Sequence, residues 1–180
     1  TLLVDTDPYN VTRAIAAGLR ARRMSVLAEE ASHDLDLRGI GRLLAFTSND
    51  EVNALATARF ARVFGRREVF QLAPSARRTG DPSVPEEHLG RLIGIEALTY
   101  ATIDERSRQG WKVRTAHGGE TIQHAVDDKL FMPLLRIVDD KLAFLCRNDP
   151  VPTEGTVIGL AAPSLQQQLD TEQAPPPAAE

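Results

Sequence analysis

The sequence predicts an α/β fold in two parts, a parallel sheet with helices followed by a small β-rich domain. Two observations predict the sheet. Short apolar runs alternate with stretches of helical periodicity up to about residue 73, and the clearest run, LLAFT at 43–47, is apolar on both faces, as a parallel strand covered by helices is. A third observation predicts the second part: from residue 111 on, turn residues separate the apolar runs, and strand and helix no longer alternate.

The first predicted elements are a strand and a helix. Residues 2–4, LLV, form an apolar run that ends on Asp5. Asp7 is expected to cap a helix that has Pro8 at its first position, and Gly18 is expected to end it. Two further elements are expected next, an extended piece over residues 19–24 and a helix that begins after Ser25.

The following helix is predicted by the segment SNDEVNALATARFARVFG, which directly follows the run at 43–47. Ser48 and Glu51 match a capping box, and the apolar residues behind them keep the helical period until Gly65. Residues 69–72 are the next predicted strand. Strand, helix and strand at this spacing are typical of βαβ units and of a parallel sheet.

The second half of the chain is expected to hold short strands. A polar loop at 74–87 leads to a short strand at 92–93 and to a helix over 99–109. Four more strands and a short helix are predicted, the strands over 111–115, 132–138, 141–147 and 156–162 and the helix over 122–127. Residues 164–180 are polar and proline-rich, which predicts a disordered tail. The predicted domains are therefore residues 1–109 and 110–163, with residues 164–180 as the tail.

Charge and composition exclude several functional classes. The formal net charge is −4, with 21 Lys and Arg against 25 Asp and Glu, so the chain lacks the basic surface that general nucleic-acid binding needs. The single cysteine, Cys146, excludes an intrachain disulfide and lies in an apolar run, where a buried structural thiol is expected. The sequence contains no run of about 18 apolar residues, so it predicts no membrane span.

The sequence shows no catalytic set, so we do not expect an enzyme. It contains no Gly-x-Ser-x-Gly motif, and Cys146 has no evident base. The paired acids at 127–128 and 139–140 are interpreted as turn residues, because they lie at polar breaks between apolar runs. His117 and His124 lack a carboxylate at ligand spacing, and the four histidines are scattered along the chain, so no metal site is expected. They are His33, His88, His117 and His124.

The run VDTDP at 4–8 points to a nucleotide-binding ancestor. In a dinucleotide-binding fold, an acid at the end of the second strand hydrogen-bonds the ribose, and a glycine-rich turn lies about 20 residues earlier. Asp5 matches that acid, but no such turn precedes it. We therefore expect a Rossmann-like parallel sheet lacking its first strand and Gly-rich turn, in a chain truncated from a longer protein. The strands at 2–5 and 43–47 would then pair directly, leave a gap or borrow a strand. The alternative is that Asp5 only caps a turn.

Several segments resemble one family of regulatory domains. VDTDPYNV, LLAFTSNDEVNALATARFARVFG and VFQLAP resemble the RCK or KTN domain (TrkA-N-like) of potassium-transport proteins, in the version fused to bacterial monovalent cation:proton antiporters of the sodium/proton type. The run at 99–114 looks like the same antiporter tail. The unit MPLLRIVDDKLAFL…PTEGTVIGLAAP is similar to the small TrkA-C-like domain of that architecture. The resemblance covers residues 1 to about 163.

The resemblance implies a non-catalytic cytosolic module that regulates sodium or potassium transport. It implies a place at the cytoplasmic face of the inner membrane, a homodimer, and the membrane transport domain of the same polypeptide as partner. It also implies a nucleotide site with Asp5 at the ribose and a loop beside the nucleotide. That loop consists of Thr47, Ser48, Asn49 and Asp50. Ser48-Asn49-Asp50 has a second interpretation, compatible with the first, as a helix cap.

Two departures from the family pattern concern the cofactor. The Gly-rich turn is absent, and Arg22-Arg23-Met24-Ser25 stands where many relatives read Gly-Asp-Ala-Thr, so the acid near the adenine is missing. We therefore expect no tightly bound cofactor in this chain, and NAD(H) or another adenine nucleotide only in the full-length parent. Two alternatives remain open, a remnant of a soluble NAD-dependent oxidoreductase and a structural dimerisation module. The lack of a catalytic set, and the β-rich domain in place of a substrate domain, favour the antiporter module.

Overall fold

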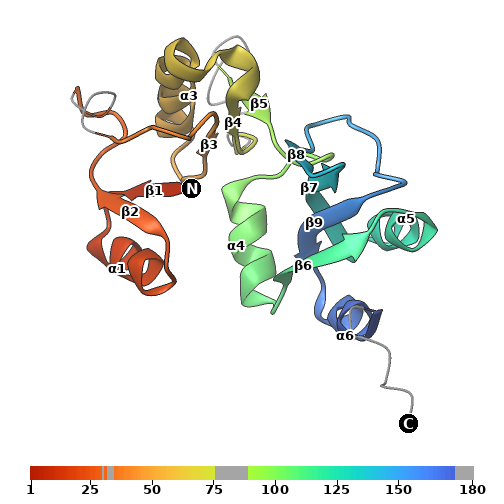
Figure 1. Cartoon of the computed structure of the whole chain (residues 1–180). Helices are drawn as coiled ribbons and strands as arrows, with labels where there is room; N and C mark the ends of the chain where they lie inside the picture. Colours follow the sequence, from red (N-terminus) through yellow and green to blue (C-terminus); the bar gives the residue numbers. More distant parts are fainter. Residues whose placement is uncertain (30, 32–34, 76–88, 173–180) are drawn as a thin grey trace. The chain divides into compact units, whose positions relative to one another are not determined.

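The computed structural model describes residues 1–29, 31, 35–75 and 89–172, and Figure 1 shows the course of the chain. The chain forms two compact units. The first contains Thr1–Gln71 together with Gly90, and the second contains Leu72–Ser75 together with the chain from Arg91 on. Both units mix helices and strands, and the parallel pairs β1–β2 and β3–β4 lie in the first unit.

The first unit is built from two strand–helix–strand segments. In the first segment β1 (Leu2–Asp5), α1 (Pro8–Ala16) and β2 (Arg20–Arg23) follow one another, and β1 pairs with β2 in parallel. In the second segment β3 (Leu43–Ala45) pairs in parallel with β4 (Val69–Gln71). The helix α3 (Asp50–Phe64) and one 3₁₀ turn, η1 (Arg66–Glu68), connect this second pair. The predicted alternation of strand and helix is confirmed in both segments.

The strands β1 and β3 do not pair with each other. The sheet formed by β1 and β2 is separate from the sheet that contains β3 and β4, and in the described part of the chain no strand joins the two. Of the three arrangements that the sequence left open, direct pairing is therefore wrong, and in the described residues a gap separates β1 from β3. The edge strand β3 and the residue that follows it also present apolar surface, since Leu44 is 37% and Phe46 is 41% exposed.

One apolar core nevertheless connects the two segments. Its centre is Phe60 of α3, whose ring stacks on Phe64 with 5.9 Å between the ring centroids. Leu2 and Val4 of β1 pack against this core from one segment, and Leu43 of β3 packs against it from the other. Burying a large apolar side chain stabilises a fold by about 1.5–3 kcal/mol, so side-chain packing holds the segments together. The predicted helix after Ser25 lies partly outside the described residues.

The second unit contains a four-stranded antiparallel sheet in the order β6-β9-β7-β8. All four strands predicted beyond residue 110 are present, and the pairs β6–β9, β7–β9 and β7–β8 are antiparallel. The elements of this unit are β5 (Arg91–Leu92), α4 (Tyr100–Arg108), β6 (Lys112–His117), α5 (Glu120–Asp127), β7 (Phe131–Val138), β8 (Lys141–Phe144), β9 (Thr156–Ala161) and α6 (Pro163–Glu172).

The hairpin between β7 and β8 explains one of the acidic pairs. Asp139 and Asp140 have φ values of 49° and 58°, and the strands pair directly beside them, Val138 opposite Lys141. Two-residue hairpin turns need positive φ at both central positions, and aspartate tolerates that conformation better than most residues do. The interpretation of this acidic pair as turn residues is therefore confirmed.

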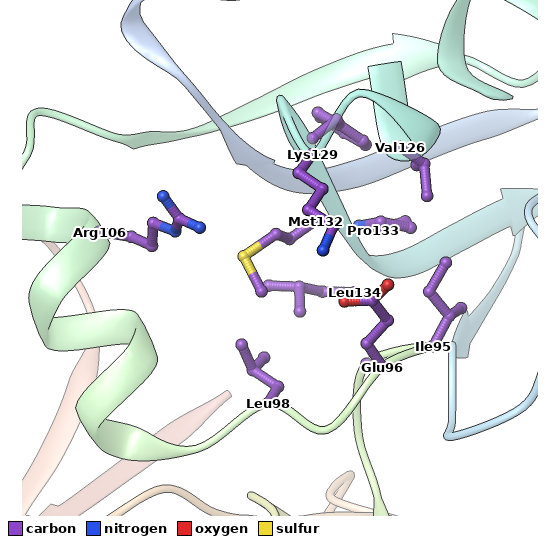
Figure 2. A pocket seen from close by; sticks show the side chains of 11 residues that line it. Ile95, Glu96, Leu98, Arg106, Val126, Lys129, Met132, Pro133 and Leu134 are labelled. Atoms are coloured by element: carbon purple, nitrogen blue, oxygen red, sulfur yellow. The ribbon is translucent and has the colours of Figure 1, made fainter. Parts of the chain in front are cut away.

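Helix α4 belongs to the second unit, although its residues were assigned to the first domain from the sequence. Ile103 packs against an apolar cluster around Trp111 and Leu160, and the Arg106 guanidinium lies 4.6 Å from the centre of the Trp111 ring. These contacts place the division between the units near residue 90, whereas the sequence predicts it at residue 109. A cavity of about 60 Å³ lies beside this cluster, between α4 and β7 (Figure 2).

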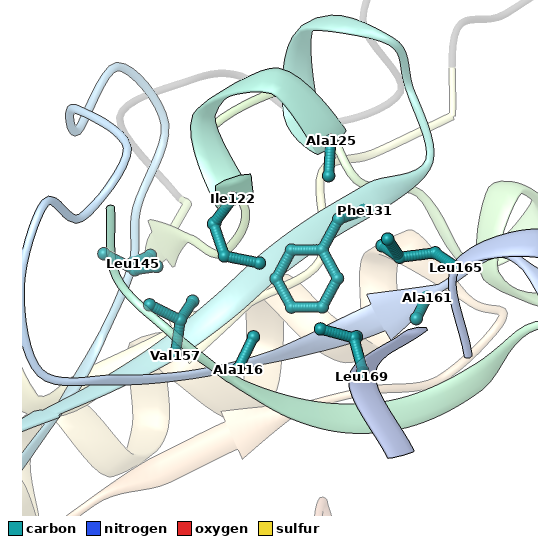
Figure 3. Close-up of a cluster of buried hydrophobic side chains, with 9 residues drawn as sticks. All are labelled: Ala116, Ile122, Ala125, Phe131, Leu145, Val157, Ala161, Leu165 and Leu169. Carbon is teal, nitrogen blue, oxygen red and sulfur yellow. The ribbon is translucent and has the colours of Figure 1, made fainter. Parts of the chain in front are cut away.

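Helix α6 contradicts part of the predicted disordered tail. Its residues Leu165 and Leu169, four positions apart, are 4% and 1% exposed, and they pack against Phe131 and Val157 in the main core of the second unit (Figure 3). Pro163 occupies the first position of the helix, which suits its fixed φ. The prediction of disorder is thus wrong for residues 164–172. Burial of two leucines on one face stabilises the helix although the residues around them are polar. Residues 173–180 lie outside the described part.

The lone thiol Cys146 is buried and forms no disulfide. Burial raises the pKa of the Cys146 thiol, and the positive charge of Arg91 partly offsets the rise. The folded chain therefore favours the neutral thiol, and the resulting contribution to stability is complete below the pKa of the unfolded thiol and decreases as the pH rises above it.

We expect Cys146 to react slowly with a thiolate-selective reagent. Both burial and the raised pKa lower the concentration of accessible thiolate, so labelling by a disulfide reagent at pH 8 should be at least about tenfold slower in the folded chain than in denaturant. Absorbance at the wavelength of the released thiolate measures the rate. Equal rates in buffer and in denaturant would show that the thiol is accessible in the folded state.

Candidate functional site

The first candidate residue, Asp5, lies at the carboxyl end of β1. Its carboxylate accepts two hydrogen bonds, from the backbone N–H of Asp7 at 2.9 Å and from the side-chain amide of Asn10 at 2.9 Å. Asp7 in turn caps α1 by accepting from the backbone N–H of Tyr9 at 2.8 Å. Asp5 therefore orders the turn that follows β1. A carboxylate has about four acceptor positions, so a ribose hydroxyl could still bind without displacing either partner.

The second candidate loop is closed by a residue that the sequence analysis did not single out, Asn53. Its side chain is 1% exposed and pairs with both backbone groups of Thr47, accepting from the N–H at 3.0 Å and donating to the C=O at 3.0 Å. The Thr47 hydroxyl lies 2.9 Å from the same amide oxygen. The chain leaving β3 is thus fixed to the second turn of α3.

The other three residues of this loop lie at the start of α3. Asn49, and not Ser48, caps the helix, because the Asn49 side chain accepts from the backbone N–H of Val52 at 3.0 Å. The capping box predicted at Ser48 is therefore wrong by one position. In the described part of the chain the Ser48 hydroxyl has no hydrogen-bond partner, and Ser48 is exposed. Asp50 is the first residue of the helix, where the positive end of the helix dipole stabilises a negative charge.

An arginine lies beside the Asp5 turn. Arg23 stands opposite Asp5 in the parallel pair of β1 and β2, and its Nε donates to the backbone oxygen of Thr6 at 3.3 Å. This residue belongs to the run in which the family resemblance expects an acid near the adenine. The structure therefore places a cation at the end of the sheet where that resemblance implies an anion.

Each of the two groups of candidate residues is held by its own helix. Asp5 is held by the first turn of α1, and Thr47 to Asp50 are held by the first turns of α3, both at the carboxyl ends of parallel strands. The side chains provide carboxylate, hydroxyl and amide groups, which suit the binding of a polar ligand. Nothing in the described residues pairs a nucleophile with a base here, and no cluster of three metal-ligating side chains occurs in them.

Two residues of this region, Asn10 and Asn53, were missed by the sequence analysis. The side-chain amide of Asn10 holds the Asp5 carboxylate, and no sequence motif points to that contact. Asn53 could have been noticed as a polar residue within an apolar helix face, because buried polar side chains almost always have a specific partner.

A scan against models of protein families finds no match, and a search of curated proteins finds no similar sequence. In the described part of the chain, no helix has the length and apolar character needed to cross a bilayer.

Proposed function

We propose that this chain is the cytosolic, non-catalytic regulatory part of a monovalent cation:proton antiporter that moves sodium or potassium. On this proposal it works at the cytoplasmic face of the inner membrane, as a homodimer, and acts on the membrane transport domain of the same polypeptide. The proposal rests on the family resemblance of the sequence and on one observation from the fold, the separation of two parallel strand pairs around a shared core.

That separation fits a Rossmann-like arrangement that lacks its central strand. In the strand order 3-2-1-4-5-6, the first strand lies between the second and the fourth. If β2 and β1 take the third and second places and β3 and β4 take the fourth and fifth, the gap between β1 and β3 falls where the first strand belongs. Ligands of such sheets bind outside the carboxyl ends of the strands, where Asp5 and residues 47–50 lie.

We expect the chain itself to bind nucleotides weakly. Calorimetric titration with NADH, ATP or a cyclic dinucleotide should give nothing tighter than a dissociation constant of about 1 mM, or roughly −4 kcal/mol. The sequence offers no glycine-rich turn, so it lacks the backbone groups that hold the pyrophosphate in dinucleotide-binding folds. Micromolar binding of any of these nucleotides would contradict this expectation, and loss of that binding in Asp5→Asn would assign it to this site.

Transport by the intact polypeptide that contains this chain tests the proposed function. Everted membrane vesicles that carry it should show dequenching of a pH-sensitive dye when sodium or potassium is added. Disrupting the chain by a destabilising substitution should change the cation concentration that gives half of the maximal signal, because the chain acts as a regulator. A variant with Gly41→Ala, at which an added Cβ meets no atom within 4 Å, serves as the matched control. No response to sodium, potassium or lithium would contradict the proposal.

A further inference from the structure

The cavity in the second unit has an apolar interior. Leu98 and Phe131 are almost fully buried beside it, and Met132 and Leu134 of β7 complete its walls. Its volume of about 60 Å³ is roughly twice the share of one water molecule in the liquid. Pockets for nucleotides and drug-sized ligands measure about 300 Å³ or more, so this cavity fits only a group of a few carbon atoms.

Two cationic side chains line the cavity. Figure 2 shows the side chain of Arg106, from α4, and that of Lys129, which follows α5, both pointing toward Met132 from opposite sides. In the described part of the chain, neither has a carboxylate within ion-pair distance, although Glu96 also lines the cavity. The Arg106 guanidinium is held in place by the Trp111 ring and by the side chain of Gln109 at 3.3 Å.

We propose that this cavity binds a small aliphatic carboxylate, with its alkyl chain against Leu98, Met132 and Leu134 and its carboxylate on Arg106. A guanidinium binds a carboxylate through two parallel hydrogen bonds, and its fixed orientation over Trp111 reduces the entropy lost on binding. Lys129 adds a second positive charge, whereas Glu96 repels the ligand's charge and limits its affinity. This inference concerns the second unit and does not rest on the proposed role in transport.

The branched four-carbon acid isobutyrate is a suitable probe, and its amide is the neutral control. The whole 180-residue chain, labelled with ¹⁵N, is titrated with sodium isobutyrate, isobutyramide and sodium chloride. We expect saturable shifts of the backbone amide signals of Gly94, Ile95 and Arg106 with the acid, and no saturation with the amide or with chloride. A ligand of this size should have a dissociation constant in roughly the millimolar range. Absence of saturation up to tens of millimolar, or equal binding of the amide, would overturn the proposal.

Three substitutions identify the groups that bind the probe. Arg106→Gln should weaken binding about tenfold, since it removes a charge-assisted contact. Glu96→Gln should tighten binding about threefold, because it removes a like charge from the cavity. Arg108→Gln is the matched control, as this residue lies on the same helix, pairs with Asp104 and does not line the cavity.

A fourth variant guards against a loss of folding. Arg106 contacts Trp111, so its replacement could unfold the unit. In that case Glu96→Gln decides alone: tighter binding of isobutyrate supports the proposal, and unchanged affinity contradicts it. Leu134→Trp, which fills the cavity from its apolar side, should abolish saturable binding while the spectrum remains that of a folded chain. A folded Leu134→Trp variant that binds isobutyrate as well as the original chain would place the ligand elsewhere and overturn the assignment.

Discussion

Replacing Gly159 with alanine is expected to lower the free energy of unfolding of the second unit by about 3 kcal/mol or to prevent its folding. The added Cβ would lie 2.3 Å from the backbone oxygen of Met132 and 2.8 Å from Cζ of Phe131. Gly159 stands opposite Pro133 in the pairing of β9 with β7, in the middle of the sheet. Neither strand can retreat, because each also pairs with another neighbour.

The fluorescence of Trp111, the only tryptophan, reports unfolding of this unit in urea. We expect the midpoint of Gly159→Ala to fall sharply, or the folded baseline to be lost. Gly41→Ala is the control, because its Cβ would meet nothing within 4 Å, and it should stay within about 0.5 kcal/mol of the original chain. A Gly159→Ala chain with an unchanged midpoint would show that β7 and β9 are not as close as the structure places them.

The second large effect is expected from Asn53→Leu in the first unit. Leucine has nearly the shape of asparagine but cannot hydrogen-bond, so the N–H and the C=O of Thr47 both lose their partner. A polar group left unpaired costs about 1–3 kcal/mol, and water can reach the exposed Thr47, so we expect a loss of about 2 kcal/mol.

Amide hydrogen exchange is the measurement that isolates this effect. The N–H of Thr47 should exchange much faster in Asn53→Leu than in the original chain, and the amides of the first turn of α3 should follow. Leu55→Ala is the control on the same helix, because Leu55 is 57% exposed and its truncation should change stability by about 0.5 kcal/mol at most. Slow exchange at Thr47 in both variants would mean that another group protects this amide.

The two segments of the first unit were predictable because local signals there agree. Asp7 and Pro8 predict the start of α1, and the apolar run at 43–47 followed by a helical period predicts β3 and α3. The face that α3 buries was less predictable. Leu55 is exposed while Asn53 is buried, because the contact with the loop after β3 decides which face turns inward, and that contact is tertiary.

The predictions that the structure contradicts also failed because tertiary contacts decide these features. Residues 164–172 are mostly polar, so their composition predicts disorder, but two buried leucines and the partners of Gln166 hold α6 in place. The position of α4 depends on Trp111, which follows it in the sequence and which composition does not link to it. At the candidate site, the residue types were predictable, whereas the capping residue and the role of Asn53 depend on geometry.

The gap between β1 and β3 has a consequence for how the first unit loses its structure. In the described residues, no ladder of backbone hydrogen bonds crosses from the β1–β2 pair to the β3–β4 pair, so the segment from Leu2 to Arg23 is joined to the rest by side-chain packing and ion pairs such as Arg20 with Asp36. Breaking side-chain packing contacts takes less free energy than breaking a continuous ladder of backbone hydrogen bonds does. We therefore expect the amides of this segment to exchange together, at a lower free energy of opening than those of α3 and its strands.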